Sequence, residues 1–383
     1  MPSRSRAAVV YNPVKVDGDE LRRAIAAEPA AADWDETVWF ETSVEDPGGG
    51  QAKAALDAGA DMVIAAGGDG TIRAVAEVLG GTSTSLALLP SGTGNLLARN
   101  LDLTLDDLAN SINVAFAGAD RRIDLAWAEL GREDGSTDRA AYLVMAGFGL
   151  DAKMLSNTDE ELKAKVGWLA YVAAVRTALR DENRMRMRYR LDRHRIRALS
   201  AHTLIIGNCG SLPANILLLP TAAIDDGRFE AVFLRPESAW GWTQIMGKVI
   251  WENGVLRRTR WGRKFVGRDV DALRYVKGRR LEVVLSRPEE IELDGDGFGR
   301  ASALRTWIDA GGLIVRVPPG EHRPSEERAD PEERRETRPE EPPPGEALPG
   351  EAEDAELPGE ITGDDDLAED TTSEGARISA ATS

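Results

Sequence analysis

Two short glycine-rich stretches carry the residues that could do chemistry. The first, Gly67-Gly68-Asp69-Gly70-Thr71, follows a β-capable run at 61–66, and the second, Pro90-Ser91-Gly92-Thr93-Gly94-Asn95, follows an apolar run at 85–89. A helical pattern comes directly after each, so both stretches predict a strand, a tight loop and a helix. Glycines let a ligand approach main-chain N–H groups at the positive end of a helix, which favours phosphate.

Asp69 is unusual in an anion-binding loop, because a carboxylate repels phosphate unless a metal ion or a transferred proton lies between them. The first loop therefore suggests metal-assisted phosphoryl chemistry. The alternative is that Asp69 only caps the helix from Ile72 and that the glycines only turn the chain. Two loops of this kind in one small domain favour the phosphate interpretation.

The elements around the loops predict a parallel sheet. Strands are expected at 7–11, 36–40, 61–66 and 85–89, and helices at 20–27, 51–58, 72–79 and 96–101. This alternation is typical of a doubly wound α/β domain, in which ligands bind at the carboxyl ends of the strands. Asn12 and Thr42 follow the first two strands, so we expect them beside the glycine loops.

From about residue 122 the pattern changes to shorter strands with turns between them, which favours an antiparallel β domain. Strands are expected at 123–130, 141–146, 184–191, 201–206, 228–234, 280–285 and 313–317, with helices at 160–179 and 238–251. We predict an α/β domain at 1–121 and a β domain at 122–320.

The remaining residues, 321–383, form an acidic tail rich in Pro, Glu and Asp. The tail holds 21 acidic and 6 basic residues, so it carries −15 of the chain's net charge of −18. It contains no aromatic residue and cannot bury enough apolar surface to order itself, so we predict that it is disordered.

The composition also excludes several classes of protein. Cys209 is the only cysteine, so there is no disulfide framework and a reducing cytoplasm is expected. Three histidines, one of them in the tail, leave little for a zinc site or a Ser-His-Asp triad. No run approaches the roughly 20 apolar residues of a membrane span. We expect a cytoplasmic protein that can contact the inner membrane face peripherally.

One segment, 238–265, combines four tryptophans with six basic residues. Tryptophan prefers the membrane interface and basic side chains are attracted to anionic lipid, so the segment is a candidate for peripheral membrane contact. The alternative is that the tryptophans belong to the core and the arginines to a solvated face.

Further motifs follow the glycine loops in a characteristic order: Ile123-Asp124, Gly147-Phe148-Gly149-Leu150-Asp151-Ala152, Gly207-Asn208, Ile224-Asp225-Asp226-Gly227 and Leu293-Asp294-Gly295-Asp296, with Asn12-Pro13 before them. From about residue 7 to residue 317 the sequence resembles the diacylglycerol kinase catalytic family, which includes bacterial diacylglycerol and lipid kinases and the sphingosine and ceramide kinases.

The resemblance implies an N-terminal Rossmann-like nucleotide domain, a C-terminal β-sandwich lipid domain and an active site in the cleft between them. It also implies ATP and Mg²⁺ as cofactors. The residues that it assigns to ATP are Asn12, Pro13, Thr42, Gly67, Gly68, Asp69, Gly70, Thr71, Gly92, Thr93 and Asn95.

By the same resemblance, Asp69, Asp124 and Asp226 belong to an acidic network linked to magnesium. Asp296 is expected to be the general base that takes the proton from a lipid hydroxyl. A structural Mg²⁺ is expected on Asp226, with the main-chain carbonyls of Ala223 and Arg228. Such roles suit the chemistry, because a hydroxyl that attacks the γ-phosphoryl group needs a carboxylate within hydrogen-bond reach and a cation to offset the charge.

Three positions depart from the family pattern. Asn95 is followed by Leu96 where the family often has aspartate, so one acidic member of the network is missing. Asp296 stands where glutamate is commoner, which shortens the reach of the expected base by about 1.5 Å. Val14-Lys15-Val16 replaces a glycine-containing turn; Lys15 either contacts phosphate or is solvated.

We therefore predict an ATP- and Mg²⁺-dependent lipid kinase that phosphorylates a hydroxyl of a diacylglycerol-like or sphingoid lipid. One alternative is a kinase of a soluble substrate, since NAD kinase shares a Gly-Gly-Asp-Gly loop. Another is a catalytically silent lipid- or nucleotide-binding regulator, suggested by Leu96 and Asp296. No nucleic-acid partner is expected. A homodimer is compatible with the sequence. The sequence does not determine the oligomeric state, the identity of the lipid or the role of the tail.

Overall fold

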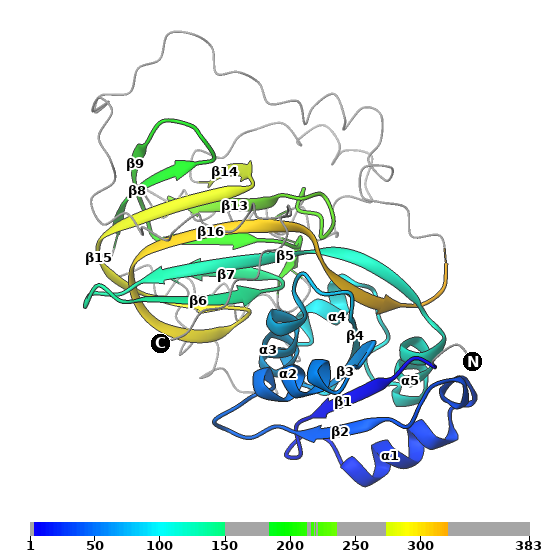
Figure 1. Ribbon diagram of the computed structural model, residues 1–383. Coiled ribbons are helices and arrows are strands. Elements are labelled where there is room, and N and C mark those ends of the chain that lie inside the picture. The colour runs from blue at the N-terminus through cyan, green and yellow to red at the C-terminus, as the bar shows by residue number, and fades with distance from the viewer. Residues whose placement is uncertain are drawn as a thin grey trace, which may run out of the picture.

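The computed structural model describes residues 4–149, 184–212, 216–217, 219, 221–235 and 273–320. The acidic tail, the expected helices at 160–179 and 238–251 and the tryptophan-rich segment at 238–265 lie outside the described residues. Figure 1 shows an N-terminal part in which helices surround a sheet, and a second part built of strands.

The N-terminal part alternates strands with helices. Its strands are β1 (Ala7–Tyr11), β2 (Val38–Glu41), β3 (Met62–Gly67) and β4 (Ser85–Pro90). Its helices are α1 (Gly18–Ala27), the 3₁₀ helix η1 (Pro29–Asp33), α2 (Gly49–Asp57), α3 (Asp69–Leu79), α4 (Leu96–Asn100) and α5 (Leu108–Ala117). The strands pair in parallel in the order β2-β1-β3-β4. The predicted parallel α/β arrangement is confirmed.

Both faces of this sheet are covered, which is why its strands read as continuous apolar runs. Alternate residues of β1, β3 and β4 pack against α2, α3 and α4 on one face, and against α1 and α5 on the other. In α3, Ile72, Val75, Ala76 and Leu79 form the buried stripe that turns this helix toward the sheet. Packing on both faces fixes where the strands end, and therefore where the loops after them lie.

The second part consists of antiparallel strands. These are β5 (Ala119–Gly131), β6 (Thr137–Tyr142), β7 (Met145–Phe148), β8 (Met185–Leu191), β9 (Arg197–Ala201), β10 (Thr203–Gly207), β11 (Ser211–Leu212), β12 (Ile216–Leu217), β13 (Phe229–Leu234), β14 (Leu273–Gly278), β15 (Arg280–Leu293) and β16 (Asp296–Val317). Their inward side chains form a second core around Tyr142, Phe148, Phe229 and Phe233. The predicted combination of an α/β part with an all-β part is confirmed.

Strand β16 connects the two parts. Its residues from Asp296 to Trp307 pair with β15 and those from Ala303 to Val317 pair with β5, while Val315 pairs in parallel with Leu86 of β4. Strands of both parts therefore share one hydrogen-bonded sheet of 14 strands among the described residues. The boundary expected between residues 121 and 122 falls inside β5. The domain limits remain a prediction.

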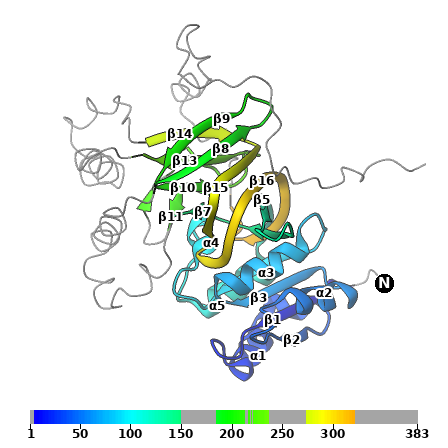
Figure 2. The same cartoon turned by 90° about the vertical axis from the view of Figure 1, so that its left-hand side faces the viewer.

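Helix α3 lies at the junction. Figure 2 shows it between the strands of the N-terminal part and those of the second part, and it packs against β6 as well as β3 and β4.

Within the described residues, no helix is both long and apolar enough to cross a membrane.

Candidate active site

The first glycine loop joins β3 to α3. Gly68 is the residue before the helix, and Asp69 is its first residue. A Cβ on Gly67 would lie 2.8 Å from Cβ of Thr71, so only glycine allows this sharp entry into the helix. Because the first-turn N–H groups of a helix have no partners within the helix, α3 opens with main-chain donors beside the loop.

Asp69 bridges the first loop to the second. Its carboxylate accepts hydrogen bonds from the main-chain N–H groups of Asn95 at 2.9 Å and Leu96 at 2.6 Å, while α3 has no side-chain cap. Burial raises the pKa of Asp69 above its ordinary range, and the nearby Asp296 raises it further, whereas the two N–H bonds lower it. The capping alternative for Asp69 is therefore not what the structure shows.

The second glycine loop lies directly against the first. A Cβ on Gly92 would come within 2.9 Å of Cα of Gly68, so the two loops touch through backbone with no room for side chains. Asn95 adopts a left-handed conformation with φ of 49°, and its side-chain oxygen accepts the N–H of Gly92 at 2.9 Å. Thr93 lies in the same loop, before α4. The two loops thus form one backbone-lined surface.

Asp296, the expected base, lies over this surface. A Cβ on Gly70 would be 2.9 Å from its Oδ2 atom. The same oxygen is 3.7 Å from a guanidinium nitrogen of Arg73, which stacks on the ring of Phe298 at 4.6 Å. The Asp296 side chain is half exposed, so it can reach a ligand as well as Arg73. The structure therefore brings Asp69, Asp296 and the glycine loops together.

Asn12 and Thr42 follow β1 and β2, at the same edge of the sheet as the loops. Asn12 donates its N–H to the carbonyl of Ala66, and its side-chain oxygen accepts the N–H of Val14, both at 2.9 Å. The N–H of Thr42 donates to the carbonyl of Tyr11. These bonds hold the turn that begins with Pro13 beside the first glycine loop.

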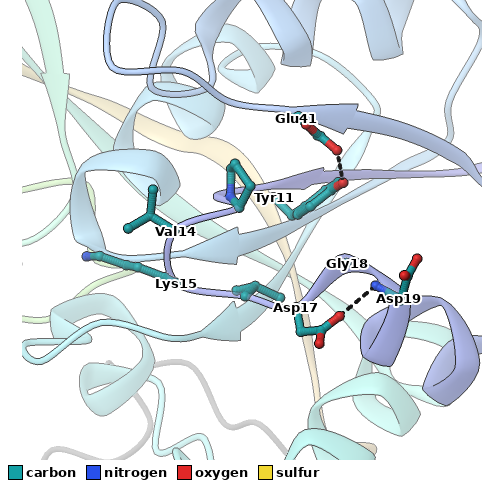
Figure 3. A pocket seen from close by; sticks show the side chains of 9 residues that line it. Tyr11, Val14, Lys15, Asp17, Gly18, Asp19 and Glu41 are labelled. Carbon is teal, nitrogen blue, oxygen red and sulfur yellow. Dashed lines mark hydrogen bonds between the residues drawn. The ribbon is translucent and has the colours of Figure 1, made fainter.

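A pocket of about 540 Å³ opens next to this turn, lined by Tyr11, Pro13, Val14, Lys15, Val16, Asp17, Gly18, Asp19 and Glu41. Figure 3 shows Lys15 on the side of the pocket away from the Tyr11–Glu41 hydrogen bond. The Lys15 ammonium lies close to the first loop, since a Cβ on Gly68 would be 2.5 Å from its Nζ atom. This lysine was left undecided by the sequence, and the structure places it at the loop.

Asp124 is buried in β5 and belongs to a second group of contacts. Its carboxylate accepts the N–H of Gly227 at 2.6 Å and that of Gly311 at 2.8 Å. Burial raises the pKa of Asp124 to about 6, and the charges of Asp226 and Asp225 add to the rise, against the effect of the two N–H bonds. Asp124 therefore ties the 221–228 loop to β16.

Asp226 is the expected ligand of a structural Mg²⁺. One of its carboxylate oxygens accepts the N–H of Arg228 at 3.0 Å, and the other lies 2.7 Å from the ammonium of Lys277. Within the described residues, no three His, Cys, Asp or Glu side chains are arranged to hold a metal ion. Both carboxylate oxygens of Asp226 are therefore engaged by protein groups, and the magnesium site expected on Asp226, Ala223 and Arg228 stays a prediction.

Two residues that the sequence did not assign hold this region together. Asp294 accepts the main-chain N–H groups of Leu143, Val144 and Met145 at 2.8 to 3.0 Å, and it begins the turn that carries Asp296. Burial raises its pKa to about 6. Asn208 donates to the carbonyls of Asp124 and Leu143, both at 3.0 Å. The Asp-Gly turn signal and the Gly207-Asn208 motif were visible in the sequence, but neither indicated these contacts.

Comparison with known proteins concerns the domain and the chain, not individual site residues. Residues 6–128 match the family model of the diacylglycerol kinase catalytic domain. A probable YegS-like lipid kinase from Pseudomonas aeruginosa is 29% identical over 83% of this chain and 99% of its own length. A diacylglycerol kinase from Staphylococcus epidermidis is 28% identical over 60% of this chain and 71% of its own.

Among solved structures, a putative diacylglycerol kinase from Bacillus anthracis has the same fold, with a TM-score of 0.62 and 20% identity over 83% of this chain and 97% of its own. The resemblance drawn from the motifs is confirmed: residues 6–128 match the diacylglycerol kinase catalytic domain, and the chain is similar to a probable YegS-like lipid kinase over nearly the whole length of that protein.

Proposed function

We propose that this protein transfers the γ-phosphoryl group of MgATP to a hydroxyl group of a diacylglycerol-like or sphingoid lipid. The observation that carries the proposal is the contact between the two glycine loops, with the Asp296 carboxylate above Gly70. Main-chain N–H groups at a helix start suit the phosphates, and a carboxylate beside them suits the proton of an acceptor hydroxyl.

In this proposal the loops bind the triphosphate, and Lys15 adds a positive charge where its ammonium approaches Gly68. A charge-assisted contact of this kind is stronger than a neutral hydrogen bond. The pocket beside Tyr11 and Glu41 continues from this point and offers polar groups to the rest of the nucleotide. Magnesium enters as part of the MgATP substrate and offsets the charge of its phosphates.

Asp296 then accepts the proton of the lipid hydroxyl. The lipid oxygen forms a bond to the γ-phosphorus, the bond from that phosphorus to the β,γ-bridging oxygen breaks, and ADP leaves with the electron pair. Arg73 holds the Asp296 carboxylate from the side of α3. Asp69 holds the two glycine loops against each other by accepting hydrogen bonds from the main-chain N–H groups of Asn95 and Leu96.

The names of the sequence relatives support a lipid as the acceptor. We place the reaction at a membrane surface, which the protein contacts peripherally from the cytoplasm. Binding to anionic vesicles that exceeds binding to neutral vesicles in a flotation assay supports this placement, and equal binding contradicts it.

The test of the function itself uses purified full-length chain, radiolabelled ATP and Mg²⁺. The acceptors are diacylglycerol and sphingosine in mixed micelles and NAD in solution. We expect label in the lipid phase with one of the two lipids. Label in NAD alone would replace the proposal with a soluble-substrate kinase. Nucleotide binding without transfer to any acceptor would favour the silent regulator.

A further inference from the structure

The loop at 221–228 gathers acidic side chains at the edge of the second part. Asp225 and Asp226 lie in the loop, and their charges act on the buried Asp124. Each of these two carboxylates has a cationic partner among the described residues. Arg121 lies 2.6 Å from Asp225, with both side chains 14% exposed, and Lys277 lies 2.7 Å from Asp226. Two fixed monovalent cations therefore stand beside two of the three acidic groups.

Lys277 reaches the loop from β14. Its Nζ atom is held by the Asp226 carboxylate and donates to the carbonyl of Thr221 at 2.8 Å, so it connects the start of the loop to its end. The Asp226 side chain is only 12% exposed. Lys277 is paired in the sheet with Glu230 of β13, and Glu230 accepts the N–H of Thr221. The strand pairing thus fixes the lysine where it can reach the loop.

This is the place where the family resemblance implies a structural magnesium ion. Mg²⁺ requires about six oxygen ligands in near-octahedral geometry at roughly 2.1 Å. Here the ammonium group takes one carboxylate oxygen of Asp226 and the main-chain carbonyl of Thr221, and the Arg228 N–H takes the second carboxylate oxygen. A divalent ion on Asp226 would have to displace the lysine, and the two cations would repel each other at such short range.

We propose that Lys277 is the resident cation of the 221–228 loop, in place of a divalent metal ion. An ammonium group with three donors can bind a carboxylate and a carbonyl at ordinary hydrogen-bond distances. The loop then keeps its shape in the absence of Mg²⁺, and through the Gly227 N–H it keeps hold of Asp124. The proposal concerns folding and does not depend on which lipid is phosphorylated.

Thermal unfolding of the full chain without nucleotide tests this assignment, in EDTA and in millimolar MgCl₂. We expect one melting temperature for the wild type under both conditions. Lys277→Met should melt a few degrees lower in EDTA, because it leaves a carboxylate of low exposure without its cation. Lys53→Met, which removes an exposed lysine of α2, is the matched control and should behave as the wild type.

Two results would overturn the proposal. One is a wild-type stabilisation by Mg²⁺ that Asp226→Asn abolishes, and the other is an unchanged melting temperature in Lys277→Met. A lowered melting temperature of Lys277→Met supports the proposal whether or not MgCl₂ partly restores it. In both cases the loss in EDTA shows that the ammonium group held the loop. If Lys277→Met does not fold, Mn²⁺ titration followed by electron paramagnetic resonance decides. Equal binding by wild type and Asp226→Asn supports the proposal, and a site lost in Asp226→Asn contradicts it.

Discussion

The carboxylate of Asp69 accepts the main-chain N–H of Leu96 at 2.6 Å, across the contact between the two glycine loops. The family often has a second carboxylate at position 96, whereas here the leucine side chain is buried and only its backbone takes part. The acidic network near the loops therefore consists of Asp69 and Asp296, which act on each other through their charges.

Asp69→Asn should loosen this junction. An amide side chain offers one oxygen and one NH₂ group, so one of the two N–H donors at 95 and 96 would face another donor. We expect a loss of about 1 to 3 kcal/mol in the free energy of unfolding, and loss of phosphoryl transfer. Denaturant unfolding and the kinase assay measure the two effects. Asp57→Asn, an exposed change on α2, is the control. Wild-type stability and turnover in Asp69→Asn would show that the two hydrogen bonds from Asn95 and Leu96 are not needed for folding or for phosphoryl transfer.

Asp296→Asn should lower kcat by a factor of about 10² to 10⁴, because a general base contributes on that scale. The KM for ATP should change little, since the lost interaction is made mainly in the transition state. Asp296→Glu should keep part of the activity, because the carboxylate remains beside Arg73. Steady-state kinetics of both variants on the preferred lipid check this. An unchanged kcat in Asp296→Asn would move the role of base to Asp69.

Lys15→Met should raise the KM for ATP by about tenfold, which corresponds to about 1.4 kcal/mol of binding. The physical reason is the loss of a cation at the loop where we place the phosphates. Initial rates over a range of ATP concentrations provide the measurement, with Lys53→Met as the matched control. Equal values for wild type and Lys15→Met would show that the lysine is only solvated.

Asp124 gives the protein a pH-dependent stability. Its pKa in the folded state is about 6, above the ordinary value of an aspartate, so between about pH 4 and 6 the folded state binds a proton that the unfolded state has released. The free energy of unfolding should therefore fall as pH rises through this range, by up to about 3 kcal/mol. Denaturant unfolding at several pH values measures this effect. Asp124→Asn should lessen that dependence without removing it, because Asp294, whose pKa is also raised to about 6, remains. If the free energy of unfolding depends on pH equally in wild type and Asp124→Asn, the raised pKa of Asp124 is contradicted.

Much of the fold could be predicted from local patterns. Strands β1, β3 and β4 are short apolar runs between turn residues, and they appear within one or two residues of the expected limits. Helix α5 was not expected, because its burial depends on the far face of the sheet and on η1. The expected strand at 141–146 is divided at residues 143–144, where the backbone turns to give its N–H groups to Asp294.

The candidate site was predictable in part. The two glycine loops are recognisable from their composition, so their residues could be identified from the sequence. The contact between Gly92 and Gly68, the bond from Asp69 to Leu96 and the approach of Asp296 to Gly70 depend on tertiary packing. The same holds for Lys277, which is 51 residues from Asp226 and reaches it only because β14 pairs with β13. Charge alone did not distinguish it from the chain's other basic residues.

The path of β16 has a consequence for how the protein is synthesised. Val315 lies beside Leu86, so this edge of β4 gains its neighbour only after residue 315 has been synthesised. Until then the N-terminal part presents an unpaired strand edge, which favours contact with other chains. The contact also closes a loop of more than two hundred residues, which slows folding. Expression of residues 1–121 alone should therefore yield an aggregation-prone fragment, and adding residues 122–320 should restore a soluble product.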